Sequence, residues 1–146
     1  MNWFEGEKVL VPFDFSDESI ETVKVALDLA EAPQDVHVLH VLMPESINEP
    51  AVVWHDKFDD ARLTTVTETM TAKLAEAKLT GPQLKVLIGS PGSMIAEFAD
   101  EIKAGMIVIP SHGLSGIKRF LLGSVAERVV RLAHCPVLVL KESAED

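Results

Sequence analysis

Short apolar runs alternate with longer amphipathic stretches from one end of the chain to the other. The runs are rich in valine, leucine and isoleucine and lie at 8–13, 36–43, 84–88, 106–109 and 136–140. Most of their residues are apolar in succession rather than at every second position. This pattern is typical of strands that are buried on both faces.

Between these runs the apolar residues recur every three or four positions, which predicts helices. The helical spacing extends over 20–30, 63–77, 95–102 and 125–132. We expect Ser16 or Asp17 to cap the first helix and Pro33 to help end it. Gly81 and Pro82 are expected to end the second helix. Ser90 followed by Pro91 predicts the start of the third.

The regular alternation of strand and helix predicts an α/β fold. We expect an open five-stranded parallel sheet with helices on both faces, in one domain spanning residues 1–146. In sheets of this kind, ligands bind beyond the C-terminal ends of the strands, where the strand order reverses. The residues that follow the first four strands are therefore the places to search for function.

Composition and charge narrow the classes of function. The chain is 47% hydrophobic and 25% charged, and its formal net charge is −10. A chain this acidic is expected neither to coat nucleic acid nor to bind an anionic membrane. Its one cysteine, Cys135, allows no internal disulfide. Together with the lack of a basic leader and of an apolar run of about 20 residues, this predicts a cytoplasmic protein.

The first three strand ends carry weaker signals. Asp14 follows the first strand, where its carboxylate either accepts a hydrogen bond from an adenine amine or ribose hydroxyl or simply caps the first helix. Both interpretations remain open. His40 and Val41 end the second strand, and their backbone is suited to meet a flat base edge, although a histidine on a buried strand is more often a core residue. Turn and cap chemistry explains residues 89–92 without a ligand.

The fourth strand end is more informative. Gly113 is followed after nine residues by Gly123 and Ser124, which open the last helix. Backbone N–H groups at a helix N-terminus, with a serine hydroxyl, form a phosphate site, and glycine lets a phosphate approach the main chain. Residues 111–134 carry a net charge of +3, whereas the rest of the chain carries −13. The alternative is that Gly123 ends a loop and Ser124 is an ordinary N-cap.

Several segments together resemble the universal stress protein family, in order and spacing. They are KVLVPFDFSDES, HVLHV, IGSPGSMIAEFA, IVIPSHGLSGIKRFLLGSVAERVV and CPVLVLK. The resemblance covers almost the whole chain. It implies a Rossmann-like sandwich of the adenine nucleotide alpha hydrolase type and a role as a stress-response regulator. It also implies a homodimer that pairs through the last strand, which would cover an apolar sheet edge.

The resemblance further implies a binding site for ATP, or for ADP or AMP, with Mg²⁺ as a possible companion. Pro12, Asp14 and Val41 match positions that hold adenine and ribose, and Ile109 lies beside the ribose. The complete set of implied binding residues is Pro12, Phe13, Asp14, Val41, Ile109, Pro110, Ser111, His112, Gly113, Gly123, Ser124 and Val125.

Pro110 departs from the family's nucleotide-binding motif, Gly-x2-Gly-x9-Gly-Ser/Thr, because it stands at the first glycine. Proline lacks an N–H and fixes φ near −65°. If that position supplies only space or a carbonyl group, ATP binding survives. If it needs a positive φ, the loop must differ. Since Gly113, Gly123 and Ser124 are present, the sequence favours retained binding.

Other activities fit the chain poorly. It lacks a P-loop, and PFDFS stands where a dinucleotide-binding enzyme or a flavodoxin-like carrier has its ligand loop. The third strand ends in Gly89 and Ser90 where a receiver domain has an aspartate. We expect no catalytic residue, because nothing in the sequence identifies a nucleophile. We also expect no metal site, because His112, His134 and Cys135 lack the spacing of zinc ligands. Slow ATP hydrolysis or self-phosphorylation is implied only for some family members.

Two functions of different class remain after this comparison. The first is a nucleotide-responsive regulator read by an unidentified protein partner. The second is a nucleotide-free, dimeric protein-interaction module, which Pro110 favours. The loop at 44–60, with Trp54 and Phe58, either gates the crevice or meets a partner.

Overall fold

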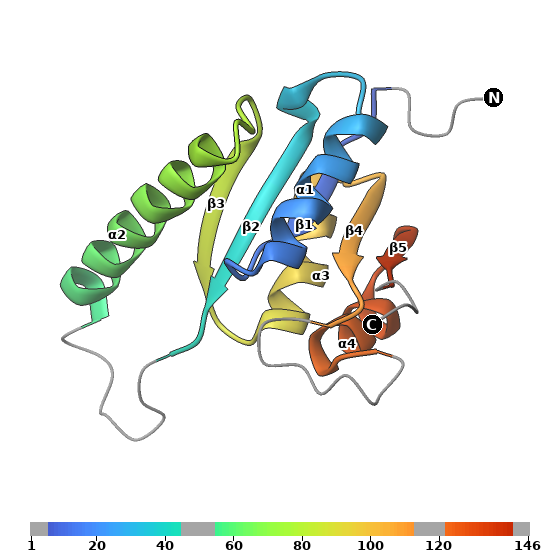
Figure 1. Cartoon of the computed structure of the whole chain (residues 1–146). Coiled ribbons are helices and arrows are strands. Elements are labelled where there is room, and N and C mark those ends of the chain that lie inside the picture. Colours follow the sequence, from blue (N-terminus) through green and yellow to red (C-terminus); the bar gives the residue numbers. More distant parts are fainter. Residues whose placement is uncertain (1–5, 45–54, 113–121, 142–146) are drawn as a thin grey trace.

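The computed structural model describes residues 6–44, 55–112 and 122–141, without the side chains of 55–59. The elements follow in the order β1 (Val9–Pro12), α1 (Asp17–Leu29), β2 (Val36–Leu42), α2 (His55–Glu76), β3 (Gln83–Ile88), α3 (Pro91–Ile102), β4 (Met106–Pro110), α4 (Ser124–Leu132) and β5 (Val137–Leu140). The five strands form one parallel sheet in the order β3-β2-β1-β4-β5 (Figure 1). The predicted fold class is confirmed.

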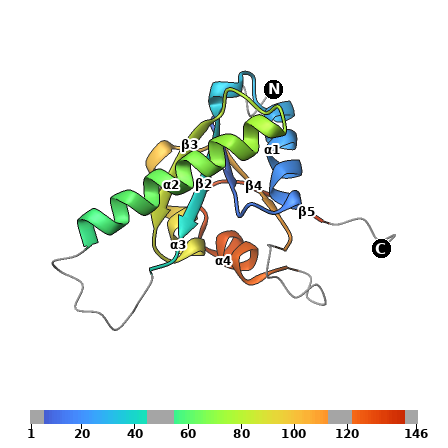
Figure 2. The ribbon, with the colours of Figure 1, turned by 60° about the vertical axis from the view of Figure 1, so that its left-hand side comes forward.

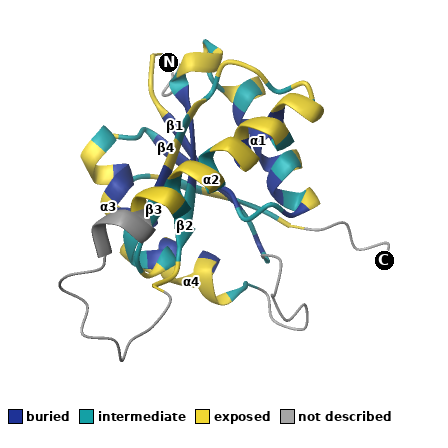
Figure 3. Cartoon of the chain, turned by 90° about the vertical axis from the view of Figure 1, so that its left-hand side faces the viewer, coloured by how far each residue is buried: buried dark blue, intermediate teal, exposed yellow. Residues whose placement is uncertain are grey.

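The sheet lies between two layers of helices, with α1 and α2 on one face and α3 and α4 on the other (Figure 2). Side chains alternate along each strand. On β1, Val9 and Val11 pack toward α1 and α2, whereas Leu10 packs toward α3 and α4, and all three are completely buried. This double burial explains why the strands are continuous apolar runs. Figure 3 shows the buried strands between helices whose outer sides are exposed.

The helix ends follow the predicted signals in part. Ser16 is the N-cap of α1, and its Oγ accepts a hydrogen bond of 3.1 Å from the backbone N–H of Ser19. Ser90 is the N-cap of α3, with Pro91 in the first turn. The expected terminators lie beyond the helices they were assigned to. Helix α1 ends before Pro33, which begins a short 3₁₀ turn, and α2 ends at Glu76, ahead of Gly81.

The strand order reverses between β1 and β4. The chain proceeds outward from β1 to β3 and then returns to the other side of β1 as β4. Pairing between β1 and β4 joins only Val9 to Met106 and Leu10 to Ile107. Because the two strands are unpaired beyond these residues, their C-terminal ends leave room for a ligand at this point. Among the described residues, no helix has the length and apolar character needed to cross a membrane.

Candidate functional site

A crevice of about 500 Å³ lies at the C-terminal ends of the central strands. It is lined by the ends of β1, β2 and β4, by Ser19 of α1, and by the N-terminal parts of α3 and α4. Its walls are Pro12, Phe13, Asp14, Ser19, Leu39, His40, Val41, Met43, Ser90, Pro91, Gly92, Ile95, Ile109, Pro110, Gly123, Ser124, Val125, Ala126 and Arg128. The volume is in the range of small-molecule and cofactor sites.

The segment after β1 is fixed by hydrogen bonds to β2. The backbone N–H of Phe13 donates to the carbonyl of Leu39 over 2.8 Å. The carbonyl of Phe13 lies 2.6 Å from Nδ1 of His40, and since a carbonyl only accepts, this nitrogen donates. The ring of His40 also contacts Phe15 edge to face, with 4.9 Å between the ring centroids. His40 therefore holds one wall of the crevice in place.

Asp14 lines the crevice and also organises the start of α1. Its side chain lines the crevice, and its Oδ1 accepts hydrogen bonds from the backbone N–H of Ser16 at 3.0 Å and from the hydroxyls of Ser16 and Ser19. Ser16 is the N-cap of α1, so Asp14 orients the capping residue rather than capping the helix itself. The same bonds fix the carboxylate at the crevice wall.

Helix α4 begins at the opposite wall. Its N-cap is Gly123, which supplies no side-chain cap, and Glu127 donates its backbone N–H to the carbonyl of Gly123. The alternative that Ser124 is the N-cap is therefore wrong. Residues 124–126 precede the first hydrogen bond of the helix ladder, so their N–H groups suit an external acceptor.

Gly123 has a structural role that the sequence did not reveal. Its N–H donates to the carbonyl of Ser111 over 2.6 Å, which draws the start of α4 against the end of β4. A Cβ at position 123 would lie 3.2 Å from that carbonyl oxygen and 3.4 Å from Cα of His112. The missing side chain thus makes room for the backbone of the neighbouring loop.

A second helix N-terminus faces the same crevice. Ser90, Pro91 and Gly92 open α3 and line the cavity. Turn and cap chemistry alone accounted for this segment in the sequence, because nothing in the chain indicates that the starts of α3 and α4 are neighbours. The positive ends of two helix dipoles therefore border one crevice.

Pro110 occupies a regular strand position. Ile107 and Ser111 donate their backbone N–H groups toward β5, to the carbonyls of Pro136 and Leu140. Backbone N–H groups alternate between the two sides of a strand, so the nitrogen of Pro110 faces β1. There the described pairing of β1 with β4 has already ended at Ile107. The proline ring therefore replaces no N–H that the described sheet uses.

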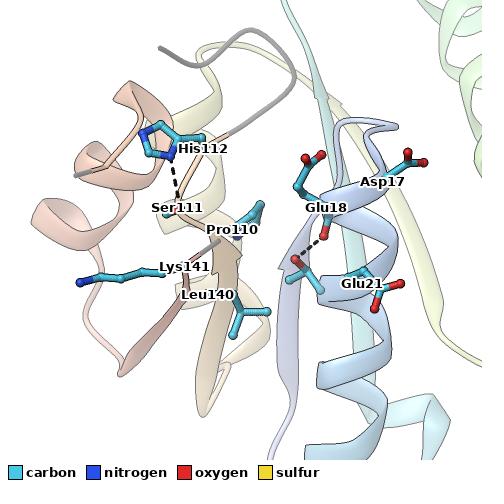
Figure 4. Close-up of a pocket in the computed structure, with 9 residues that line it drawn as sticks. Asp17, Glu18, Glu21, Pro110, Ser111, His112, Leu140 and Lys141 are labelled. Atoms are coloured by element: carbon cyan, nitrogen blue, oxygen red, sulfur yellow. Dashed lines mark hydrogen bonds between the residues drawn. The ribbon is translucent and has the colours of Figure 1, made fainter. Parts of the chain in front are cut away.

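Two predicted site residues lie on a different pocket. Ser111 and His112 border a cavity of about 300 Å³ between α1 and the ends of β4 and β5, and Ser111 Oγ lies 3.3 Å from Nδ1 of His112. Asp17, Glu18 and Glu21 of α1 are among the residues that border this cavity. In Figure 4 the side chains of Asp17 and Glu21 point away from Pro110 and His112, and Lys141 points away from α1.

The predicted residues can now be sorted by position. The structure brings together Pro12, Phe13, Asp14, Val41, Ile109, Pro110, Gly123, Ser124 and Val125 in the crevice. It places Ser111 and His112 outside it, although Pro110 borders both cavities. Gly113 lies outside the described residues, as does Trp54, and the side chain of Phe58 is not described.

The sequence did not identify several of the crevice residues, namely Ser19, Leu39, Met43, Ile95, Ala126 and Arg128. Arg128 had a usable signal, because it follows Ser124 by four residues and therefore shares a face of α4 with it. No group of histidine, cysteine or acidic side chains in the described part of the chain is arranged to hold a metal ion. Cys135 is a free, partly buried thiol whose pKa is raised, mainly by burial.

The model of the universal stress protein family matches residues 6–141. The chain belongs to the universal stress protein family. It is 35% identical over 144 residues to universal stress protein MJ0531 of Methanocaldococcus jannaschii, covering 96% of this chain and 85% of that protein. Its identity to universal stress protein YxiE of Bacillus subtilis is 31%, over 92% of this chain and 98% of the relative.

Solved structures of universal stress proteins share the fold. The protein MJ0577 superposes with a TM-score of 0.73 at 25% identity, covering 95% of this chain and 98% of that one. A universal stress protein in complex with cAMP gives 0.63 at 26% identity, over 94% and 98% of the two chains. The Archaeoglobus fulgidus protein in complex with dAMP gives 0.61 at 26% identity, over 91% and 96%.

Proposed function

We propose that this universal stress protein binds an adenine nucleotide, ATP in the first instance, in the crevice at the strand ends. The observation that carries the proposal is the meeting of two kinds of wall in one cavity. Apolar and carboxylate groups suited to a nucleoside stand at the ends of β1 and β2. The first turns of α3 and α4, suited to phosphates, stand opposite them.

Charge distinguishes the crevice from the neighbouring cavity. The crevice has one carboxylate, that of Asp14, and one guanidinium, that of Arg128, among its described lining residues. The cavity beside α1 is bordered by Asp17, Glu18 and Glu21. The carboxylates on this part of α1 would disfavour a phosphate group in that cavity, which supports the crevice as the nucleotide site.

The solved relatives support an adenine-containing ligand. Two universal stress proteins of the same fold were solved with cAMP and with dAMP, each covering more than nine-tenths of this chain. The ligand class that these proteins share is an adenine nucleotide. Mg²⁺ would accompany the phosphates rather than occupy a dedicated protein site.

We propose that the bound nucleotide favours one conformation of a cytoplasmic homodimer, and that a protein partner binds this conformation. Strand β5 is the last strand of the sheet, and Leu138 on it is 39% exposed. An apolar edge strand is a site of aggregation unless it is paired. Pairing of two copies through β5 would cover it. The proposed role is binding rather than turnover.

The test is equilibrium binding of ATP, ADP and AMP by calorimetry, with and without Mg²⁺, after any co-purified ligand has been stripped. Micromolar binding of ATP is expected. Absence of binding to all three nucleotides would overturn the proposal and leave the nucleotide-free interaction module, which Pro110 suggested, as the remaining function.

A further inference from the structure

Arg128 is the arginine among the described residues that line the crevice. It lies on α4 and lines the cavity together with Ser124, which precedes it by one helical turn. Its side chain is exposed to solvent. Arg128 therefore lies on the same face of α4 as Ser124, next to the helix start that is proposed to bind phosphate.

The guanidinium of Arg128 is held by α3. Its Nε and one terminal nitrogen donate to Oγ of Ser93 over 3.1 and 3.0 Å. Ser93 lies in the first turn of α3, next to Gly92. These two bonds use one edge of the guanidinium, which has five N–H groups in a planar fork.

Gly92 provides the space in which the arginine stem lies. A Cβ at position 92 would be 2.7 Å from Cδ of Arg128 and 2.8 Å from its Cβ and Cγ. The aliphatic part of Arg128 thus packs directly on the glycine backbone. A larger residue at position 92 would displace the arginine while leaving its charge in the protein.

The positive charge of Arg128 has no carboxylate partner among the described residues. Its hydrogen-bond acceptor is a neutral hydroxyl, whereas the neighbouring Glu127 pairs with Arg131. A guanidinium held in a fixed plane, beside two helix N-termini and without a counter-charge, is suited to bind a phosphate group through two parallel hydrogen bonds.

We propose that Arg128 binds the phosphate chain of the nucleotide and thereby gives the crevice a higher affinity for ATP than for nucleosides. This inference rests on the proposed nucleotide binding. Ser93 and Gly92 position the guanidinium, and the N–H groups that Ser93 does not use bind the phosphate. The alternative is that Arg128 only fastens α3 to α4, in which case its removal would affect all ligands alike.

The experiment compares adenosine, AMP, ADP and ATP binding to the intact chain and to Arg128→Gln by calorimetry. Loss of the charge-assisted, bidentate hydrogen bonds between the guanidinium and a phosphate group is expected to weaken ATP binding by about tenfold to a hundredfold. Adenosine binding is expected to stay within about twofold, since adenosine has no phosphate. Arg128→Lys should recover part of the loss, because lysine keeps the charge but not the fork.

Arg131→Gln is the matched control. It removes the same charge from the same helix, but Arg131 pairs with Glu127 and is not among the crevice residues. Its ATP affinity should equal that of the wild type. Gly92→Ala is the second variant, and it should lower the ratio of ATP to adenosine affinity in the same direction as Arg128→Gln. Combined in one chain, the two substitutions should give less than the sum of their separate effects.

The outcomes separate this inference from the proposed function. If the wild type binds no adenine nucleotide, the proposed function fails and the role of Arg128 falls with it. If the wild type binds ATP and Arg128→Gln lowers ATP and adenosine affinity by the same factor, or lowers neither, the proposed function stands and the role of Arg128 is overturned. Thermal unfolding of each variant identifies any loss that comes from misfolding.

Discussion

The backbone N–H of Gly123 donates to the carbonyl of Ser111 over 2.6 Å, and this contact joins the start of α4 to the end of β4. The approach is so close that a Cβ on Gly123 would lie 3.2 Å from the carbonyl oxygen. The position of the helix N-terminus at the crevice therefore depends on a residue without a side chain.

Gly123→Val is expected to abolish ATP binding. The branched side chain cannot fit against Ser111, so the first turn of α4 must move away from the crevice. The same overpacking is expected to lower the free energy of unfolding by about 1–3 kcal/mol. Calorimetry with ATP and urea denaturation measure the two effects. Unchanged ATP affinity in a folded Gly123→Val protein would show that the start of α4 is not part of the site.

Asp14→Ala is expected to weaken both the helix cap and the ligand site. The substitution removes the acceptor that orients Ser16 and Ser19, and loss of cap geometry costs about 1 kcal/mol. Because Asp14 also lines the crevice, adenosine and ATP affinity should fall together. Ser16→Ala is the control, since it removes the cap without removing a crevice residue. If both variants lose affinity equally, Asp14 acts on the ligand only through the cap.

His37 is expected to make stability fall on the acid side of neutrality. Burial lowers the pKa of this histidine below its ordinary value of 6.5, with nearby Lys8 acting in the same direction and Asp35 against it. Its Nε2 is buried and has no hydrogen-bond partner among the described residues. The unfolded chain therefore binds a proton more readily than the folded one. The contribution of His37 to the free energy of unfolding is fully present above pH 6.5. It is lost as the pH falls through the lowered pKa of this histidine.

Urea denaturation between pH 5 and 8 tests this dependence, over a range of about three pH units around the ordinary histidine pKa. His37→Leu removes the titrating group from the same buried position, so its stability should vary less over that range. An identical pH profile in the wild type and in His37→Leu would assign the acid sensitivity to other groups.

Leu138→Lys is expected to convert the proposed dimer into a monomer. Leu138 lies on the edge strand β5, and a charge there opposes pairing with a second copy. Leu29→Lys is a matched control, because Leu29 has the same exposure of 39% but lies at the end of α1. Sedimentation velocity reports the oligomeric state. A monomeric wild type, or a dimer that survives Leu138→Lys, would contradict pairing through β5.

The fold class follows from the sequence because burial imposes a periodicity. Val9, Leu10 and Val11 are consecutive apolar residues, and only a strand covered on both faces buries all three. Two helix starts were equally legible, since Ser16 and the Ser90–Pro91 pair are local signals. The start of α2 was predicted wrongly, because this helix begins at His55 rather than at residue 63 and includes the end of the expected loop at 44–60. Helix ends were less legible, because α1 and α2 stop before the proline and glycine that were expected to end them.

The sequence by itself also predicted that the residues after β1, β2 and β4 lie together at one crevice, because the strand ends of a parallel sheet meet at one edge. It could not determine what depends on distant neighbours. Only the tertiary structure decided that the start of α3 faces that of α4, that Gly92 makes room for Arg128, and that Ser111 and His112 border a separate acidic cavity. The physical reason is that periodicity and caps are set by residues a few positions apart. The pairing of helix N-termini depends instead on how the sheet orders its strands, which no local pattern contains.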